Sequence, residues 1–182
     1  MKETMTAQEA LTRLRAGNET YLSAVTNPGD ISARLRGVTA EYGQHPYAVI
    51  VACADSRVVP EHIFGAGLGE LFVIRAAGNV IGDHELGSIE YGAEHLGCRL
   101  VVILGHTGCG AVDAALNSEP EGYVRCLTDA IRENIGGVTD PTQASCLNAQ
   151  AGAQTVRGLI HVPGLEVVGA LYHIDTGAVE FL

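Results

Sequence analysis

The chain of 182 residues is 47% hydrophobic and 18% charged, which is typical of a folded globular protein and excludes a disordered one. Its formal net charge of −10 disfavours nucleic acid and anionic membrane surfaces as partners, because both repel an acidic protein. This length suits a single domain, which we expect to consist of a helical arm over residues 1–43 and an α/β core over residues 44–182.

The beginning of the chain has no secretory signature. Residues 1–15 are polar and mixed in charge, without the apolar stretch of a signal peptide. The longest apolar runs elsewhere have the length of strands and are too short to cross a bilayer. We therefore expect a cytoplasmic protein. The number of cysteines is odd, at five, and in a reducing compartment they favour metal binding or catalysis over disulfides.

The first predicted elements are two helices. Thr6 and Glu9 have the spacing of a capping box, in which each side chain accepts a hydrogen bond from the other's backbone, so a helix should follow to about Ala24. A second helix is predicted near Ile31–Tyr42, after the break at Pro28-Gly29. No strand pattern occurs in this front section, which we interpret as a helical arm.

The core begins with a change of pattern near residue 47. Apolar runs over residues 47–52, 71–74 and 100–104 predict strands that are buried on both faces. Between the last two we expect a helix with Asp83 as its N-cap and Gly97 at its end, so the order favours a parallel α/β sheet. The remaining predicted elements are helices over Gly110–Leu116, Tyr123–Asn134 and Thr142–Leu159, a strand over Leu165–Ile174, and a hairpin turn at Asp175–Gly177 into Ala178–Leu182.

Two short polar segments directly follow predicted strands. Cys53, Asp55 and Arg57 come after the first strand, and His106 and Cys109 come after the third. In open parallel sheets, ligands collect beyond the carboxyl ends of the strands. If the two strands are neighbours, the segments face each other across about 5 Å, which is one strand spacing.

Two sulfurs and one imidazole form a ligand set that zinc favours. Three protein ligands leave a fourth position for water, which is typical of a catalytic site rather than a structural one. The His-x-x-Cys segment alone is a weak signal, and the paired Cys-x-Asp-x-Arg segment makes it much stronger. The alternative interpretation is three inert buried side chains beside an ordinary ion pair between Asp55 and Arg57.

Together these two motifs resemble the β-class carbonic anhydrases, and more closely the plant-type branch with an open site. The segments over residues 72–79, 88–91 and 169–172 are similar to the same family in order and spacing. The resemblance implies a central four-stranded parallel sheet with an added antiparallel edge strand, flanked by helices. It also implies an N-terminal arm that wraps a partner subunit, in a homodimer or a higher homo-oligomer.

The resemblance further implies reversible hydration of carbon dioxide to bicarbonate and a proton, by hydroxide bound to one zinc ion per chain. The ligands would be Cys53, His106 and Cys109. Asp55 would accept a hydrogen bond from the zinc-bound water, and Arg57 would keep that carboxylate ionised and oriented. Because two thiolates cancel the charge of the metal, we expect activity to rise with pH through a midpoint above about 7.

The small apolar substrate implies an apolar pocket. By resemblance, its lining residues are Gln44, Phe72, Ala77, Tyr91 and Gly110, although each is equally compatible with a place in the core. Two other functions remain open. The same scaffold supports hydrolysis of carbon disulfide or carbonyl sulfide in some relatives, and a non-catalytic zinc-binding protein would also retain the three ligands.

Overall fold

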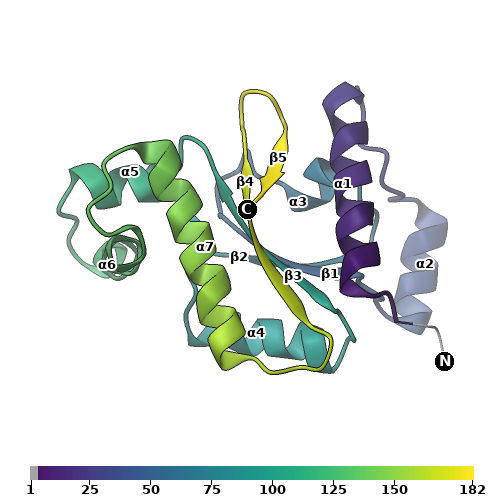
Figure 1. Cartoon of the computed structure of the whole chain (residues 1–182). Coiled ribbons are helices and arrows are strands. Elements are labelled where there is room, and N and C mark those ends of the chain that lie inside the picture. The colour runs from purple at the N-terminus through teal and green to yellow at the C-terminus, as the bar shows by residue number, and fades with distance from the viewer. Residues whose placement is uncertain (1–3) are drawn as a thin grey trace.

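The computed structural model describes residues 4–182, which form a five-stranded sheet with the strand order β2-β1-β3-β4-β5 (Figure 1). The first four strands are parallel and the last one is antiparallel to its neighbour. The predicted mostly parallel sheet with an antiparallel edge strand is therefore confirmed. The strands are β1 (Ala48–Ala52), β2 (Leu71–Arg75), β3 (Leu100–His106), β4 (Glu166–Tyr172) and β5 (Val179–Phe181).

Helices cover both faces of the sheet. On one face, α1 (Ala7–Ser23) and α3 (Pro60–Ile63) pack on a core cluster that includes Ile50 and Val102. On the other face, α4 (Asp83–Glu94) and α7 (Pro141–Leu159) pack on a second cluster that includes Val51. Every residue of β1 and of β3 is buried, which explains why their sequences are apolar without alternation.

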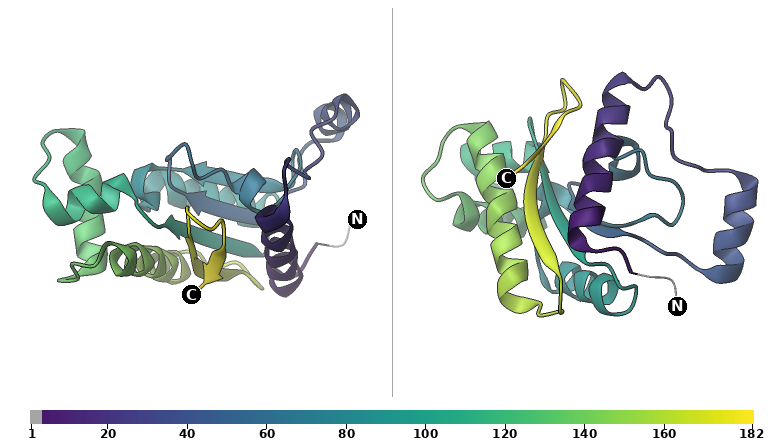
Figure 2. Two further views of the ribbon diagram at one scale, coloured as in Figure 1. Left: turned by 90° about the horizontal axis from the view of Figure 1, so that it is seen from above. Right: turned by 45° about the vertical axis from the view of Figure 1, so that its right-hand side comes forward.

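In the part of the chain that the structure describes, three further α-helices and one 3-10 turn lie outside these two layers. The helix α2 (Ala33–Tyr42) has no buried residue along its described length and stands apart from the sheet (Figure 2). At the carboxyl end of the sheet, α5 (Gly110–Asn117) and α6 (Tyr123–Ile135) pack against each other and against a 3-10 turn, η1 (Ala77–Asn79). None of the helices within residues 4–182 combines the length and the apolarity that crossing a bilayer requires.

Most predicted boundaries agree with the structure to within one or two residues, and the Thr6–Glu9 capping box is present. Two are wrong. Gly82, not Asp83, is the N-cap of α4, because the Glu85 carboxylate accepts the Gly82 N–H at 3.0 Å. The helix also ends at Glu94, and Gly97 lies in the turn that leads to β3, with a φ of 78°. The elements α3 and η1 were not predicted.

A buried asparagine joins the first helix to two distant segments. The Asn18 amide donates to the carbonyls of Ile63 at 3.2 Å and Gly177 at 2.9 Å, and its oxygen accepts the Val179 N–H at 2.9 Å. Only 6% of Asn18 is exposed, so these contacts are largely shielded from water, and removing the side chain would leave buried backbone groups unpaired.

Replacing Asn18 with alanine should lower the free energy of unfolding by about 2–4 kcal/mol, since each buried group left unpaired costs about 1–3 kcal/mol. Urea denaturation of the two proteins measures this difference. Asn117→Ala is the control, because Asn117 is exposed and its side chain, within residues 4–182, donates only to Asp113 on the same helix. An equal decrease in the free energy of unfolding of the two variants would contradict the proposed anchoring of α1.

Candidate metal centre

The structure brings Cys53, His106 and Cys109 together at the carboxyl end of the sheet. Cys53 directly follows β1, His106 is the last residue of the neighbouring parallel strand β3, and Cys109 is the N-cap of α5. The two sulfurs and a ring nitrogen of His106 lie within 4.8 Å of one another, and all three side chains are buried. Two loops that are far apart in the sequence therefore form one cluster.

The imidazole of His106 has one ring nitrogen available to coordinate a metal ion. Its Nδ1 lies 3.0 Å from the Thr107 carbonyl, which can only accept, so Nδ1 donates to it, and in the neutral ring this tautomer has the free lone pair on Nε2. Nε2 is buried and has no hydrogen-bond partner among the residues that the structure describes. A buried polar atom without a partner costs about 1–3 kcal/mol, and coordination to a metal ion would satisfy it. The residues present therefore fit a metal ion.

The sulfur of Cys53 is surrounded by hydrogen-bond donors. The Cys109 thiol is the main donor and holds the pKa of Cys53 far below its usual range, although burial opposes this shift. The backbone N–H groups of Gly78, at 3.2 Å, and Asp55, at 3.4 Å, also donate to this sulfur. This lowered pKa favours the thiolate form of Cys53, which is the form that coordinates metals.

The pKa of the second cysteine shifts in the opposite direction. The hydrogen bond to Cys53, followed by burial, raises the pKa of Cys109, while the backbone N–H groups of Val112 and Ala111 at the beginning of α5 oppose the shift. A metal ion that binds both sulfurs must displace the proton of Cys109. The same N–H groups then stabilise a second thiolate.

An ion pair lies beside the cluster. Arg57 donates from Nε to Oδ1 of Asp55 at 3.0 Å and from Nη2 to Oδ2 at 2.7 Å, so the contact is bidentate. The Arg57 side chain is the main reason that the pKa of Asp55 lies well below its usual range. Arg57 Nη2 also donates to the Gly108 carbonyl at 3.2 Å, which joins the two motif loops.

Two residues outside the motifs also support the cluster, and neither was predicted to do so. Arg75, at the end of β2, donates to the carbonyls of Cys53 at 3.1 Å and Asp55 at 2.6 Å. Gly78 has a φ of 69°, in the left-handed region that favours glycine, and a Cβ atom there would lie 2.7 Å from Cδ1 of Ile131, which would have to move. The sequence signal that could have found Gly78 is the Ala-Gly-Asn segment over residues 77–79, shortly after the predicted strand over residues 71–74.

The candidate pocket residues divide into two groups. Ala77 in η1 and Gly110 at the beginning of α5 lie at the carboxyl end of the sheet, next to residues of the cluster. Phe72 pairs with Val49 near the beginning of β1, so about 13 Å of strand separates this level from Cys53.

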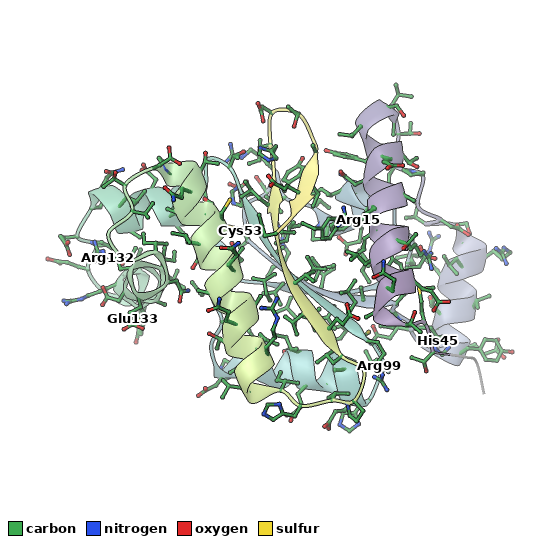
Figure 3. The ribbon with its side chains drawn as sticks, viewed as in Figure 1. Arg15, His45, Cys53, Arg99, Arg132 and Glu133 are labelled. Carbon is green, nitrogen blue, oxygen red and sulfur yellow. The ribbon has the colours of Figure 1, made fainter. Side chains whose placement is uncertain are left out.

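The other two candidates lie on the Phe72 side. The ring centroid of Tyr91 on α4 is 6.0 Å from that of Phe72. Gln44 is exposed and precedes β1, beside Gly69. Figure 3 shows Cys53 towards one end of the sheet and His45, the neighbour of Gln44, towards the other. The structure therefore does not bring Gln44, Phe72 and Tyr91 to the cluster of their own chain.

The fold and the cluster define an α/β protein with a candidate metal centre at the edge of the sheet where such folds bind ligands. A family model described as carbonic anhydrase matches residues 48–179. Carbonic anhydrase 2 of Mycobacterium tuberculosis is 38% identical over 184 residues, with 90% of this chain and 87% of that protein covered. The carbonic anhydrase of Mycolicibacterium smegmatis is 36% identical, with 80% and 79% covered.

Solved structures agree with these relatives. The β-carbonic anhydrase of Coccomyxa, in complex with acetazolamide, superposes with a TM-score of 0.69 at 26% identity over 96% of this chain and 82% of that chain. CafA, a β-carbonic anhydrase of Aspergillus fumigatus, gives 0.69 at 29% identity over 82% and 80%. The chain therefore belongs to the β-carbonic anhydrase family, whose reaction is the reversible hydration of carbon dioxide, and the resemblance seen in the motifs is confirmed.

Proposed function

We propose that this chain hydrates carbon dioxide at one zinc ion held by Cys53, His106 and Cys109. The observation that carries this proposal is the convergence of two sulfurs and an unpaired buried imidazole nitrogen within 4.8 Å. Two thiolates and one imidazole are ligands that zinc prefers. When bound, zinc acidifies a water molecule, so that a hydroxide nucleophile is available near neutral pH.

Asp55 and Arg57 orient the attacking water in this proposal. An ionised carboxylate can only accept hydrogen bonds, so a water molecule that contacts Asp55 must donate to it and turn a lone pair away from it. Arg57 keeps Asp55 ionised through the bidentate pair and prevents the carboxylate from rotating. Because Arg57 holds the carboxylate, Asp55 is outside the cluster of ligand atoms, which supports an open site.

Stopped-flow measurement of carbon dioxide hydration, together with metal analysis, tests this function. We expect about one zinc per chain and a rate that depends on it. One zinc per chain without hydration would favour the non-catalytic alternative.

The similarity of this chain to a solved carbon disulfide hydrolase is limited to the fold, at 18% identity and a TM-score of 0.57. Hydrogen sulfide release from carbon disulfide or carbonyl sulfide, faster than hydration of carbon dioxide, would favour that alternative.

The hydration rate should rise with pH through a midpoint above about 7, which is the value typical of a zinc site with three neutral histidines. The two thiolates cancel the charge of the metal, so the water is less acidic. Asp55 stays ionised over this range because its pKa is lowered, so its own titration does not contribute. A profile that is flat from mildly acidic to alkaline pH would contradict the proposed ligand set.

A homodimer or larger homo-oligomer is part of the same proposal. A structural relative from Sordaria macrospora, at 26% identity, is a tetrameric β-carbonic anhydrase. In this chain, α2 has no buried residue among those that the structure describes. Its side chains Val38 and Tyr42 are exposed, and so is Ile31 just before it. Three of the candidate pocket residues lie away from the metal centre of their own chain: Gln44, Phe72 and Tyr91. They could therefore line such a centre only across a subunit interface.

We also propose a cytoplasmic location, where thiolate ligands stay reduced.

Replacing Val38 with aspartate should dissociate the assembly and lower the hydration rate together, since the charge would be buried against a partner and the pocket would lose its distant residues. Sedimentation velocity and stopped-flow assays measure the two effects. Val124→Asp on α6 is a matched control, because Val38 and Val124 are 42% and 51% exposed. A monomeric Val38→Asp variant with full activity would show that each chain has a complete pocket.

A further inference from the structure

A chain of three hydrogen bonds leads from α6 to a sulfur of the metal centre. Nδ2 of Asn134 donates to Oδ1 of Asn148 at 2.9 Å, and Nδ2 of Asn148 donates to the Gly78 carbonyl at 2.8 Å. The N–H of the same glycine donates to Cys53 Sγ at 3.2 Å. Asn148 lies on α7, far from the motifs in sequence, and only 2% of it is exposed.

Gly78 needs an external anchor. Its φ of 69° lies in the left-handed region that favours glycine, and glycine is also the residue whose backbone is least restricted. The N–H and the carbonyl of Gly78 belong to two peptide groups joined at one Cα atom. Holding the carbonyl in place therefore limits the directions in which the N–H can point.

We propose that Asn148 is a positioning residue for the metal ligand Cys53: it holds the Gly78 carbonyl and thereby keeps the Gly78 N–H directed at the sulfur. This inference rests on the metal centre proposed above. A hydrogen bond from a peptide N–H withdraws charge from a thiolate, so the sulfur donates less to the metal. The bond also holds the sulfur in place before the metal arrives.

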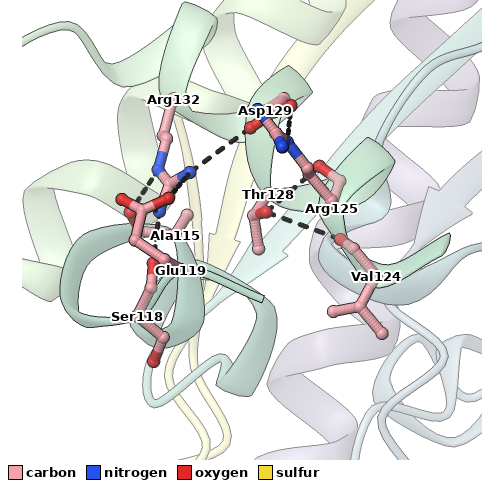
Figure 4. A network of polar contacts seen from close by, with 8 residues as sticks. All are labelled: Ala115, Ser118, Glu119, Val124, Arg125, Thr128, Asp129 and Arg132. Atoms are coloured by element: carbon pink, nitrogen blue, oxygen red, sulfur yellow. Dashed lines mark hydrogen bonds and ion pairs between the residues drawn. The ribbon is translucent and has the colours of Figure 1, made fainter. Parts of the chain in front are cut away.

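The helix that carries Asn134 is itself held in place. Figure 4 shows Arg132 of α6 between the end of α5 and Asp129. Arg132 donates to the carbonyl of Ala115 at 2.9 Å and to that of Ser118, and it pairs with Glu119 at 3.1 Å. Since α5 begins next to Cys109, the same helix pair supports both sulfur ligands.

Asn148→Leu tests the proposal, because leucine has a similar size and cannot donate to Gly78. Ser145→Ala is the matched control. Ser145 is on the same helix and is 2% exposed, and among the described residues its hydroxyl donates only to the Pro141 carbonyl of that helix. Zinc affinity is measured by competition with a chromophoric chelator. In cobalt-substituted protein, the absorption band for charge transfer from sulfur to metal reports how strongly the thiolate donates.

We expect Asn148→Leu to bind zinc about 10-fold or more weakly, as is typical when a group that orients a ligand is lost. Its cobalt band should move to longer wavelength, because a thiolate with one hydrogen bond fewer is easier to oxidise. Ser145→Ala should change neither quantity. A variant with unchanged affinity and an unchanged band would overturn the proposal, whereas wild-type protein that binds no zinc or cobalt would instead overturn the metal centre itself.

If Asn148→Leu does not fold, Asn134→Ala carries the test. Asn134 is only partly buried, and its loss frees the oxygen of Asn148, so the carboxamide is oriented less firmly. A smaller shift of the cobalt band in the same direction supports the proposal. An unchanged band in a folded Asn134→Ala variant with one metal bound counts against it.

Discussion

Cys109→Ala should lose the metal and, with it, the hydration activity. Zinc sites with a full set of protein ligands have apparent binding free energies of about 10–16 kcal/mol. One of three protein ligands therefore contributes several kcal/mol, and its loss should weaken zinc binding by about 100-fold or more, since about 1.4 kcal/mol is a factor of ten. Chelator competition measures the affinity, and metal analysis after dialysis measures retention.

Cys98→Ala is the control for this variant. Cys98 is also buried, at 1% exposed, but its thiol donates to the Pro46 carbonyl and lies before β3 rather than after it. We expect the Cys98 variant to retain about one zinc per chain and its activity. A Cys109→Ala protein that binds zinc as tightly as the wild type would remove the basis of the proposed ligand set.

Asp55→Ala should retain zinc and lose hydration activity by about 100-fold or more, which is the size of effect expected when a group that orients the reacting atoms is removed. The carboxylate is bonded to Arg57 and is not part of the ligand cluster, so its loss leaves both sulfurs and the imidazole in place. Stopped-flow rates per bound zinc, rather than per chain, separate orientation from metal loss.

Asp113→Ala provides a charge-matched comparison. Asp113 is an exposed carboxylate on α5, close to Cys109 in sequence, and it accepts a hydrogen bond only from Asn117 among side chains within residues 4–182. Its removal changes the net charge by the same amount as Asp55→Ala does. Because Asp113 has no proposed role in orienting the attacking water, we expect the hydration rate to stay nearly unchanged. If Asp55→Ala lost zinc while each remaining zinc kept full activity, Asp55 would be a ligand and not an orienting group.

The local sequence predicted the strands and their relation to the motifs because both depend on short-range patterns. Residues 47–52 and 100–104 are apolar without alternation, which is a property of strands covered on both faces, and each run is followed by a candidate metal-binding motif. Parallel strands place their carboxyl ends at one edge, so the approach of Cys53 and His106 followed from topology once the strands were neighbours.

Small elements and helix ends were less predictable. The one-turn helix α3 is too short to show a helical period, and its end signals are Pro60, Glu61 and His62. The turn η1 depends on Gly78, whose positive φ leaves no repeating pattern in the sequence. The misplaced N-cap of α4 has a similar cause. Gly82 has no side chain to accept a bond, and the reciprocal contact comes only from Glu85.

The class of fold, the family and the three side chains that can hold a metal were all predictable from the order of the amino acids, because that order places each motif at the end of a strand. Tertiary packing, in contrast, separated Gln44, Phe72 and Tyr91 from that centre and joined Asn148 to Gly78. Such contacts join segments far apart in the chain, and their distances depend on how helices pack on the sheet. No local pattern in the sequence carries that information.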